Sequence, residues 1–235
     1  MPNATARLRA IIFDFNGVIA DDEAPHFLAF QQALAENGIG LSKEDYYGTY
    51  LGMDERNCLV ALMKSRRGKL NREDPERILT RKAELFRRYT TTCKPDLFPG
   101  VAEFVLAAGH RYRLAIASGG RREQIEWALR GNPIAHLCAV VVSAEDTTLG
   151  KPEPQIYQVA LERMNGTDPA VVPLIRPEEC LVIEDSKAGI QAARRAGMKV
   201  VALATTYPAE HLTEADSVLR NWGEVSFERL EGLFR

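Results

Sequence analysis

The chain has 235 residues, and 30 Lys and Arg oppose 32 Asp and Glu, for a formal net charge of −2. This length is enough for one large domain or two small ones, and without a block of like charge we expect no nucleic-acid or membrane-surface role. No apolar run approaches the roughly 18 residues of a membrane span, and the N-terminus lacks a signal-peptide pattern. The four cysteines, Cys58, Cys93, Cys138 and Cys180, show no CxxC spacing. We therefore expect a cytoplasmic protein with reduced, buried thiols and no zinc.

Short apolar runs predict a parallel sheet. The first covers residues 10–13, and three more cover residues 114–117, 139–142 and 181–183, each bounded by polar or turn residues. A fifth strand is expected over 199–204, after a helix over 188–196 that Gly197 ends. Alternation of strands and helices predicts an α/β fold with a doubly wound parallel-sheet core and right-handed crossovers.

Between about residues 22 and 95 helical spacing replaces the strand pattern. The apolar positions that recur at this spacing are Phe27, Phe30, Ala33, Leu34, Leu59, Leu62, Met63, Ile78, Leu79, Leu85 and Phe86. An insert directly after the first strand is expected to lie over the C-terminal edge of the sheet as a helical cap, or else to be a helical subdomain that does not move. The predicted core is residues 1–20 and 96–235, and the predicted cap is residues 21–95. The loop over 165–177 carries no predicted role.

Two of the predicted strands end in groups suited to a phosphate site. Asp14 directly follows the first apolar run, at the sheet edge where open α/β folds hold ligands, and Gly17 turns the backbone three residues later. Ser118-Gly119-Gly120 follows the second run and offers a hydroxyl and flexible N–H groups to phosphate oxygens.

Two further predicted strands add charge. After the third strand, Lys151 stands before Pro152, where we expect a helix to begin, and its ammonium would neutralise phosphate charge. The fourth strand runs into Glu184-Asp185, which together with Asp14 offers the hard oxygen ligands that Mg²⁺ prefers. Each group alone is ordinary, since an Asp after a strand is often a helix cap and a lysine is usually a surface residue. The order of all four is the specific signal.

With these motifs in this order, the chain resembles the haloacid dehalogenase superfamily. It is most similar to the branch with a small helical cap that includes β-phosphoglucomutase and many sugar-phosphate phosphatases. The matching stretches, which span nearly the whole chain, are Asp14-Phe15-Asn16-Gly17-Val18, Ser118, Lys151 in Gly-Lys-Pro-Glu-Pro, and Glu184-Asp185-Ser186 with Gly189-Ile190 and Ala196-Gly197-Met198.

The resemblance implies roles in the core. Asp14 would attack phosphorus and form an aspartyl-phosphate, assisted by Lys151. Mg²⁺ would be held by Asp14, Asp185 and the backbone carbonyl of Asn16, with Glu184 as a ligand directly or through water. Ser118 and the N–H of Gly119 would hold the transferring phosphoryl oxygens.

The resemblance also implies substrate-binding residues. His26 corresponds to a histidine near the hinge of the cap. Arg56, after Leu51-Gly52-Met53-Asp54, corresponds to an arginine that grips a distal phosphate, and Lys82 corresponds to a cap lysine. Arg121 lies on the cap side of the core and would also meet substrate. The alternative for each is an ordinary solvated charge on a helix.

The sequence departs from the family at Asn16, where a second aspartate usually transfers the proton to the leaving oxygen and from water. An amide cannot carry that proton, and losing acid/base help costs roughly 10²–10⁴ in rate. Three accounts stay open. The chain is a slow enzyme, it acts on a substrate whose leaving group needs no acid, or it is a catalytically quiet binding protein. Replacing Asn16 by Asp is expected to raise activity on alkyl phosphates more than on aryl phosphates.

Together these arguments predict a Mg²⁺-dependent phosphohydrolase. It would act through an aspartyl-phosphate on a small phosphorylated metabolite, for which a sugar phosphate is the first choice. The alternatives are a β-phosphoglucomutase-like phosphotransferase, a phosphonate-type hydrolase that would need Lys64 or Lys82 as an amine, and a weak metabolite-binding protein. We expect a monomer.

Overall fold

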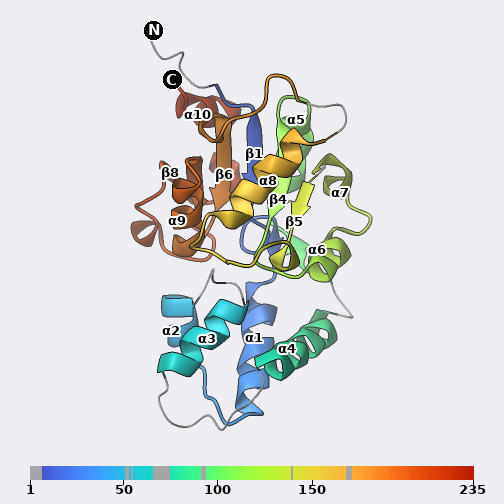
Figure 1. Cartoon of the computed structure of the whole chain (residues 1–235), viewed down its shortest axis with the longest axis vertical. Helices are drawn as coiled ribbons and strands as arrows, with labels where there is room; N and C mark the ends of the chain where they lie inside the picture. Colours follow the sequence, from blue (N-terminus) through green and yellow to red (C-terminus); the bar gives the residue numbers. More distant parts are fainter. Residues whose placement is uncertain are drawn as a thin grey trace.

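The computed structural model describes residues 7–50, 53, 55–65, 75–90, 94–138, 140–167 and 171–235. Figure 1 shows an α/β core that carries both described ends of the chain at its far side, and a separate group of helices, α1 to α4, at the opposite side. Residue 139 of the third predicted strand, Cys93, residues 51, 52 and 54, and part of the 165–177 loop lie outside the described residues.

The core contains a six-stranded sheet in the order β5-β4-β1-β6-β7-β8, with parallel pairing throughout. Its strands are β1 (Ala10–Phe13), β4 (Arg113–Ala117), β5 (Val140–Val142), β6 (Cys180–Glu184), β7 (Lys199–Leu203) and β8 (Ser217–Leu219). Phe13 at the end of β1 pairs with Ile116 on one side and Ile183 on the other, so the three central strands end at the same level. The predicted α/β fold with a parallel-sheet core is confirmed.

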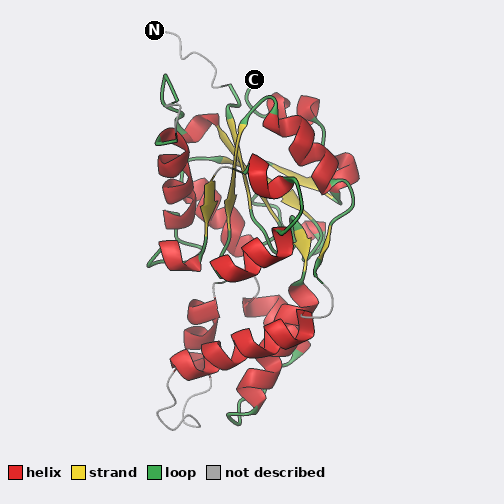
Figure 2. Ribbon diagram, turned by 90° about the vertical axis from the view of Figure 1, so that its right-hand side faces the viewer, coloured by secondary structure: helices red, strands yellow, loops and turns green. Residues whose placement is uncertain are grey.

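Side chains of β1 alternate between two buried layers, as a strand covered on both faces requires. Ala10 and Ile12 belong to one apolar cluster, while Ile11 and Phe13 belong to the other. The first face is covered by α8 (Gln155–Asn165) and α9 (Lys187–Arg195). The second is covered by α5 (Val101–Gly109), α6 (Arg122–Leu129), α7 (Ile134–Leu137) and α10 (Phe227–Gly232). Figure 2 shows the strands between these helices.

The helical cap follows β1, as predicted. Its elements are α1 (Glu23–Ala35), α2 (Lys43–Asp45), the π-helical turn η1 (Tyr46–Tyr50), α3 (Glu55–Ser65) and α4 (Pro75–Thr90), and α1 packs along α4. Most of the apolar positions predicted to face inward do so, including Phe27, Leu59 and Ile78. The chain enters and leaves the cap through β2 (Ala20–Asp21) and β3 (Asp96–Leu97), which pair with each other antiparallel.

One predicted boundary is wrong. The helix expected to begin at Pro152 begins at Gln155, because Gly150 first accepts a hydrogen bond of 3.0 Å from the N–H of Glu153 and closes a turn. Lys151 lies in this turn and is buried. The helix predicted over 188–196 is α9, and Gly197 follows it with a φ of 78°, the left-handed conformation that glycine adopts without strain.

Short 3₁₀ helices complete the core, namely η2 (Ala144–Asp146), η3 (Pro177–Glu179), η4 (Ala209–His211) and η5 (Trp222–Glu224). Cys58, Cys138 and Cys180 are buried thiols. Within the described ranges, no helix has both the length and the apolar composition needed to cross a membrane.

Candidate functional site

A buried lysine joins two carboxylates at the C-terminal edge of the sheet. Nζ of Lys151 donates a hydrogen bond of 2.6 Å to Oδ1 of Asp14 and a second hydrogen bond to Oε1 of Glu184. Lys151, Asp14 and Glu184 are at most 6% exposed. Asp14 follows β1, Glu184 is the last residue of β6, and the turn at Lys151 precedes α8, so the parallel register brings the three side chains together.

Glu184 is surrounded by donors. Its Oε1 also accepts from the hydroxyl of Tyr157 at 2.7 Å, and its Oε2 accepts from the N–H of Asp185 at 2.9 Å and from the N–H and hydroxyl of Ser186 at 3.0 and 2.9 Å. A Cβ on Gly189 would lie 1.7 Å from Oε1, so the close approach of Glu184 to α9 requires glycine there. With both oxygens engaged, Glu184 is better suited to hold Lys151 than to ligate a metal directly.

Asp185 lies against the turn that follows β1. Gly17 has a φ of 73°, and a Cβ there would lie 2.0 Å from Oδ2 of Asp185 and 2.7 Å from the hydroxyl of Thr206. Thr206 hydrogen-bonds the Asp185 carboxylate. Gly17 is therefore required twice, for its backbone conformation and for the space that Asp185 occupies.

The site contains more acidic than basic groups, and burial shifts the pKa values of the acids. Burial raises the pKa of Asp14 to about 7, since it and the repulsion from Glu184 outweigh the opposing effect of Lys151. Burial also raises the pKa of Asp185 well above its usual range, reinforced by the charges of Glu184 and Asp14. For Lys151, burial would lower the pKa, but Asp14 and Glu184 raise it.

This donor set fits a divalent cation. Carboxylate oxygens of Asp14, Glu184 and Asp185 lie within 4.8 Å of one another, and all three residues are buried. Three carboxyl groups face one ammonium with little solvent, and the raised pKa values of Asp14 and Asp185 show that their ionised forms lack a sufficient cation. Hard oxygen donors of this kind match the preference of Mg²⁺.

Asn16 is fixed by hydrogen bonds on both sides of its amide. Its Nδ2 donates to Oδ1 of Asp22 at 2.8 Å, and its Oδ1 accepts from the hydroxyl of Ser118 at 3.2 Å. The hydroxyl of Ser118 in turn accepts from the N–H of Gly120 at 3.0 Å. The residue that departs from the family pattern is thus tied to the predicted phosphate loop.

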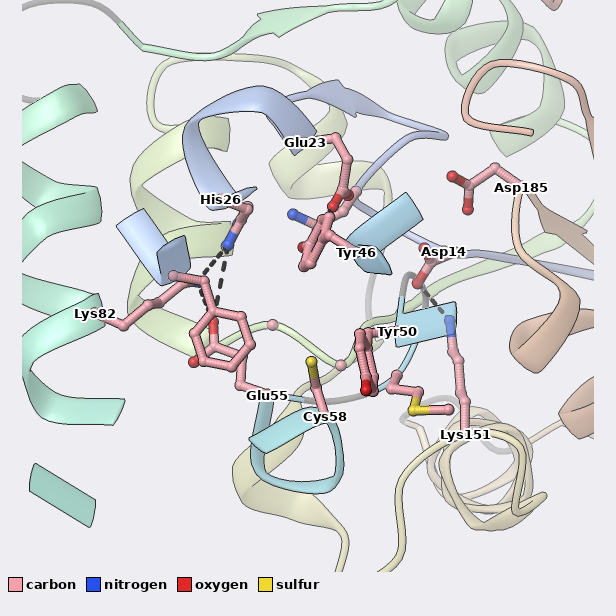
Figure 3. Close-up of a pocket in the computed structure, with 15 residues that line it drawn as sticks. Asp14, Glu23, His26, Tyr46, Tyr50, Glu55, Cys58, Lys82, Lys151 and Asp185 are labelled. Atoms are coloured by element: carbon pink, nitrogen blue, oxygen red, sulfur yellow. Dashed lines mark hydrogen bonds and ion pairs between the residues drawn. The ribbon is translucent and has the colours of Figure 1, made fainter. Parts of the chain in front are cut away.

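A pocket opens between this edge of the sheet and the cap. It is lined by Asp14, Asn16, Gly119, Gly120, Lys151 and Asp185 from the core and by Glu23, His26, Phe30, Tyr46, Tyr50, Met53, Glu55, Cys58 and Lys82 from the cap. Figure 3 shows the Lys151–Asp14 pair on one side of the pocket and His26, Lys82 and Glu55 on the other. Ser118 and Glu184 lie fully buried behind the core wall.

The cap wall contains a buried charged cluster. The Lys82 side chain is 2% exposed, and its ammonium hydrogen-bonds both Nδ1 of His26 and Oε1 of Glu55. The ring of His26 stacks on Phe86, with centroids 4.1 Å apart. Both His26 and Lys82, predicted from the sequence to bind substrate, line the pocket.

Several pocket residues were not predicted. Glu23 accepts a hydrogen bond of 2.7 Å from the hydroxyl of Tyr46, and burial raises the pKa of Glu23. Glu55, which also lines the pocket, and Tyr157, which binds Glu184 behind it, were not predicted either. Each is a polar residue on a helix of mixed composition, where the sequence pattern does not distinguish a buried partner from a solvated one.

Arg56 and Arg121 line a second groove, which continues from the pocket and shares Glu55, Gly119 and Lys151 with it. Both arginines are largely exposed there. Arg56 is paired with Glu76, and Arg121 lies 3.5 Å from Glu145. The structure therefore separates the two arginines from the pocket that holds His26 and Lys82.

Known proteins resemble this chain over most of its length. The family profile described as haloacid dehalogenase-like hydrolase matches residues 11–203. A phosphorylated carbohydrates phosphatase of Thermotoga maritima is 32% identical over 227 residues, which cover 95% of each chain. Protein CbbY of Rhodobacter capsulatus is 30% identical over 227 residues, which cover 92% of each chain.

Solved structures show the same fold. An aspartate-to-asparagine mutant of CbbY from Rhodobacter sphaeroides, in complex with xylulose-(1,5)bisphosphate, aligns with a TM-score of 0.78 and 25% identity and covers 93% of this chain and 96% of that chain. A β-phosphoglucomutase of Clostridium difficile aligns with a TM-score of 0.82 and 20% identity over 97% of both chains, which shows the fold alone. The match over most of its length shows that this chain belongs to the haloacid dehalogenase-like hydrolases.

Proposed function

We propose that this hydrolase removes phosphate from a small phosphorylated metabolite, with Asp14 as the nucleophile and Mg²⁺ as the cofactor. The observation that carries the proposal is the buried arrangement of Asp14, Lys151 and Asp185 at the floor of a pocket. A carboxylate in such a pocket is suited to attack phosphorus once nearby positive charge reduces its repulsion from the phosphate.

Mg²⁺ would be held by the carboxylates of Asp14 and Asp185 and by the backbone carbonyl of Asn16. Glu184 would contact the ion through water, because both of its oxygens already accept hydrogen bonds. When bound, the ion would withdraw charge from the phosphoryl oxygens.

The chain's own residues account for the rest of the reaction. A carboxylate oxygen of Asp14 forms a bond to phosphorus as the bond from phosphorus to the ester oxygen breaks. Lys151 stabilises the phosphoryl oxygens together with the N–H of Gly119. The hydroxyl of Ser118, predicted for the same role, would support them through Asn16 and Gly120, because it is buried and donates to Oδ1 of Asn16. Water then attacks the aspartyl-phosphate, which releases inorganic phosphate and restores Asp14.

With Asn16 in place of an acid, substrates with a good leaving group would react faster than those whose leaving oxygen needs a proton. The leaving oxygen must take its proton from water, because an amide cannot supply one. A relative named as a phosphorylated carbohydrates phosphatase supports a sugar phosphate as the substrate class. The two arginines of the second groove, Arg56 and Arg121, would meet the distal part of this substrate. Turnover of such alkyl phosphates would be slow.

The proposed cap spans residues 21–95, and the proposed core spans 1–20 and 96–235. Pairing of β2 with β3 supports these boundaries, because it brings Ala20 beside Leu97 and Asp21 beside Asp96. A hinge at this two-stranded link would let the cap open the pocket to substrate and close it again.

The first test is hydrolysis of an aryl phosphate and of a panel of sugar phosphates, with Mg²⁺ and with a chelator. Release of phosphate from the aryl ester that requires Mg²⁺ and disappears in Asp14→Asn is the expected result. Asp21→Asn, which removes a nearby exposed carboxylate, serves as the matched control. Turnover that survives in Asp14→Asn, or that is absent with every substrate, would overturn the proposal.

A further inference from the structure

Asp22 stands at the start of the first cap helix but does not cap it. It is the residue before α1, a position where an Asp side chain ordinarily accepts a hydrogen bond from a backbone N–H of the first turn. Here its side chain makes no such bond, although the residue is 2% exposed. A buried carboxylate that does not cap the helix needs another hydrogen-bond partner.

The partner of Asp22 is the amide of Asn16. Oδ1 of Asp22 accepts from Nδ2 of Asn16 at 2.8 Å. A carboxylate offers acceptors, so it selects the NH₂ end of the amide and turns the carbonyl oxygen the other way. That oxygen accepts from the hydroxyl of Ser118, and it would lie 3.3 Å from a Cβ on Gly120, a residue that lines the pocket.

The second oxygen of Asp22 faces the cap. Oδ2 lies 3.4 Å from Nε2 of His26, an ion-pair distance, although Nε2 makes no hydrogen bond of acceptable geometry in the described part of the chain. Nδ1 of this ring contacts the ammonium of Lys82, which can only donate, so Nδ1 is the acceptor and Nε2 carries the proton. Asp22 therefore lies between a core amide and a cap N–H.

From this arrangement we infer that Asp22 is a positioning residue, which locks the Asn16 amide with its oxygen toward the phosphate loop. The inference rests on the proposed function and refines it. An amide held in this orientation offers an acceptor to the hydroxyl or water that attacks the aspartyl-phosphate. It offers no donor to the leaving oxygen, since Nδ2 is committed to Asp22.

The pair has a consequence for restoring an acid/base group. In Asn16→Asp alone, two carboxylates would face each other at hydrogen-bond distance without a donor between them. In Asn16→Asp combined with Asp22→Asn, the bond is restored with donor and acceptor exchanged. Residues 16 and 22 therefore have to be changed together to obtain the full gain on alkyl phosphates that is expected from an aspartate at position 16.

The test compares alkyl and aryl phosphate hydrolysis in Asn16→Asp, Asp22→Asn, Asp22→Ala and the double variant, with Asp21→Asn as the control. The double variant is expected to raise alkyl phosphate turnover by roughly 10²-fold or more, the usual size of acid/base help, while Asn16→Asp alone gains far less. An equal gain in Asn16→Asp alone would overturn the inference.

Asp22→Ala tests positioning directly. It is expected to lower kcat on the aryl phosphate by about tenfold, the rate equivalent of one ordinary hydrogen bond, with little change in KM. Asp22→Asn is expected to recover part of this loss, because its side-chain oxygen can still accept from Asn16. An Asp22→Ala variant that matches Asp21→Asn in kcat would overturn the inference.

A measurement without substrate separates this inference from the proposed function. In thermal unfolding, the losses in Tm from Asn16→Ala and Asp22→Ala are expected to be smaller in combination than their sum, because each removes the same hydrogen bond. Additive losses would contradict the pair even in an active enzyme. If the two losses in Tm are coupled but the protein hydrolyses no phosphate ester, the Asn16–Asp22 pair stands and only the proposed function is refuted.

Discussion

Nζ of Lys151 lies 2.6 Å from Oδ1 of Asp14, and this contact joins the turn after β5 to the end of β1. The same ammonium also binds Glu184. A buried cation between two buried carboxylates is stable only as a set, because each charge lacks the water that would otherwise solvate it. The arrangement explains why Lys151 is expected to matter for both folding and chemistry.

Lys151→Met is expected to lower aryl phosphate turnover by roughly 10²–10³-fold, since it removes positive charge beside the phosphoryl group. It should also lower the free energy of unfolding of the metal-free protein by about 3–5 kcal/mol, because Asp14 and Glu184 lose their partner. Steady-state kinetics and urea unfolding measure the two effects. Lys199→Met is the matched control. It breaks the pair of Lys199 with Asp216, in which the lysine side chain is 43% exposed, and should cost no more than about 1 kcal/mol.

Gly17→Ala is expected to lose Mg²⁺-dependent activity, because its Cβ would lie 2.0 Å from the Asp185 carboxylate. Gly38→Ala separates this clash from backbone strain. Gly38 has nearly the same φ, 72° against 73°, and no described atom lies within 4 Å of its added Cβ. In both variants the free energy of unfolding should fall by about 1–2 kcal/mol, because alanine is strained in the left-handed conformation. If Gly38→Ala lost as much activity as Gly17→Ala, a role for Gly17 in accommodating Asp185 would be refuted.

Mg²⁺ is expected to stabilise the protein against heat, by about 2.7 kcal/mol when its free concentration is a hundredfold above Kd. Asp185→Asn should abolish this gain. Without metal, the same variant should be at least as stable as the unmodified chain, because the folded state no longer buries a carboxyl group whose ionised form is disfavoured by burial and by the charges of Glu184 and Asp14. Scanning calorimetry with Mg²⁺ and with a chelator gives both comparisons. A full Mg²⁺ effect in Asp185→Asn would show that the ion binds elsewhere.

The environment of Asp146 predicts how the free energy of unfolding changes at acid pH. Burial would raise its pKa, but hydrogen bonds from Arg163 and Ser143, aided by the charge of Arg122, lower it below the usual carboxyl range. A lowered folded-state pKa means that the carboxylate stabilises the protein above the unfolded-state pKa and stops doing so as the pH falls through the folded-state value.

Asp146→Asn is therefore expected to lower the free energy of unfolding by about 1–3 kcal/mol at pH 7. The difference from the unmodified chain should shrink as the pH falls below about 4, toward the folded-state pKa. Urea unfolding at several pH values measures this difference, and Glu126→Gln on the exposed side of α6 is the control. A difference that stays constant down to acid pH would contradict the assigned role.

Most of the fold followed from periodicity. Four of the five predicted strands were recognisable as continuous apolar runs between turn residues, and the fifth, β7, followed from the helix end at Gly197. The edge strand β8 was missed because only Leu219 of its three residues is buried, which leaves no run to detect. The start of α8 was misplaced because the turn at Gly150 depends on a backbone hydrogen bond that residue type alone does not specify.

The site residues that directly follow a strand could be predicted from the sequence, because the end of the strand determines where they lie. Asp14, Ser118 and Asp185 each directly follow a central strand, and the parallel register necessarily places them at one edge of the sheet. The cap residues were harder to assign. Arg56 and Lys82 look alike in sequence, yet the Arg56 side chain is 67% exposed and that of Lys82 is 2% exposed. This difference arises from how α3 and α4 pack, which is not a local property.

By itself, the sequence determined the alternation of strands and helices, the helical insert and the order of the polar groups that follow the strands, because these depend on local spacing. Tertiary structure alone decided that Glu184 holds Lys151, that Gly17 makes room for Asp185, and that Asp22 turns the Asn16 amide. Each of these depends on how closely particular atoms approach and, for Glu184 and Asn16, on which end of the side chain meets which partner. Such distances and hydrogen-bond directions are set only when folding brings the groups within about 3 Å of each other.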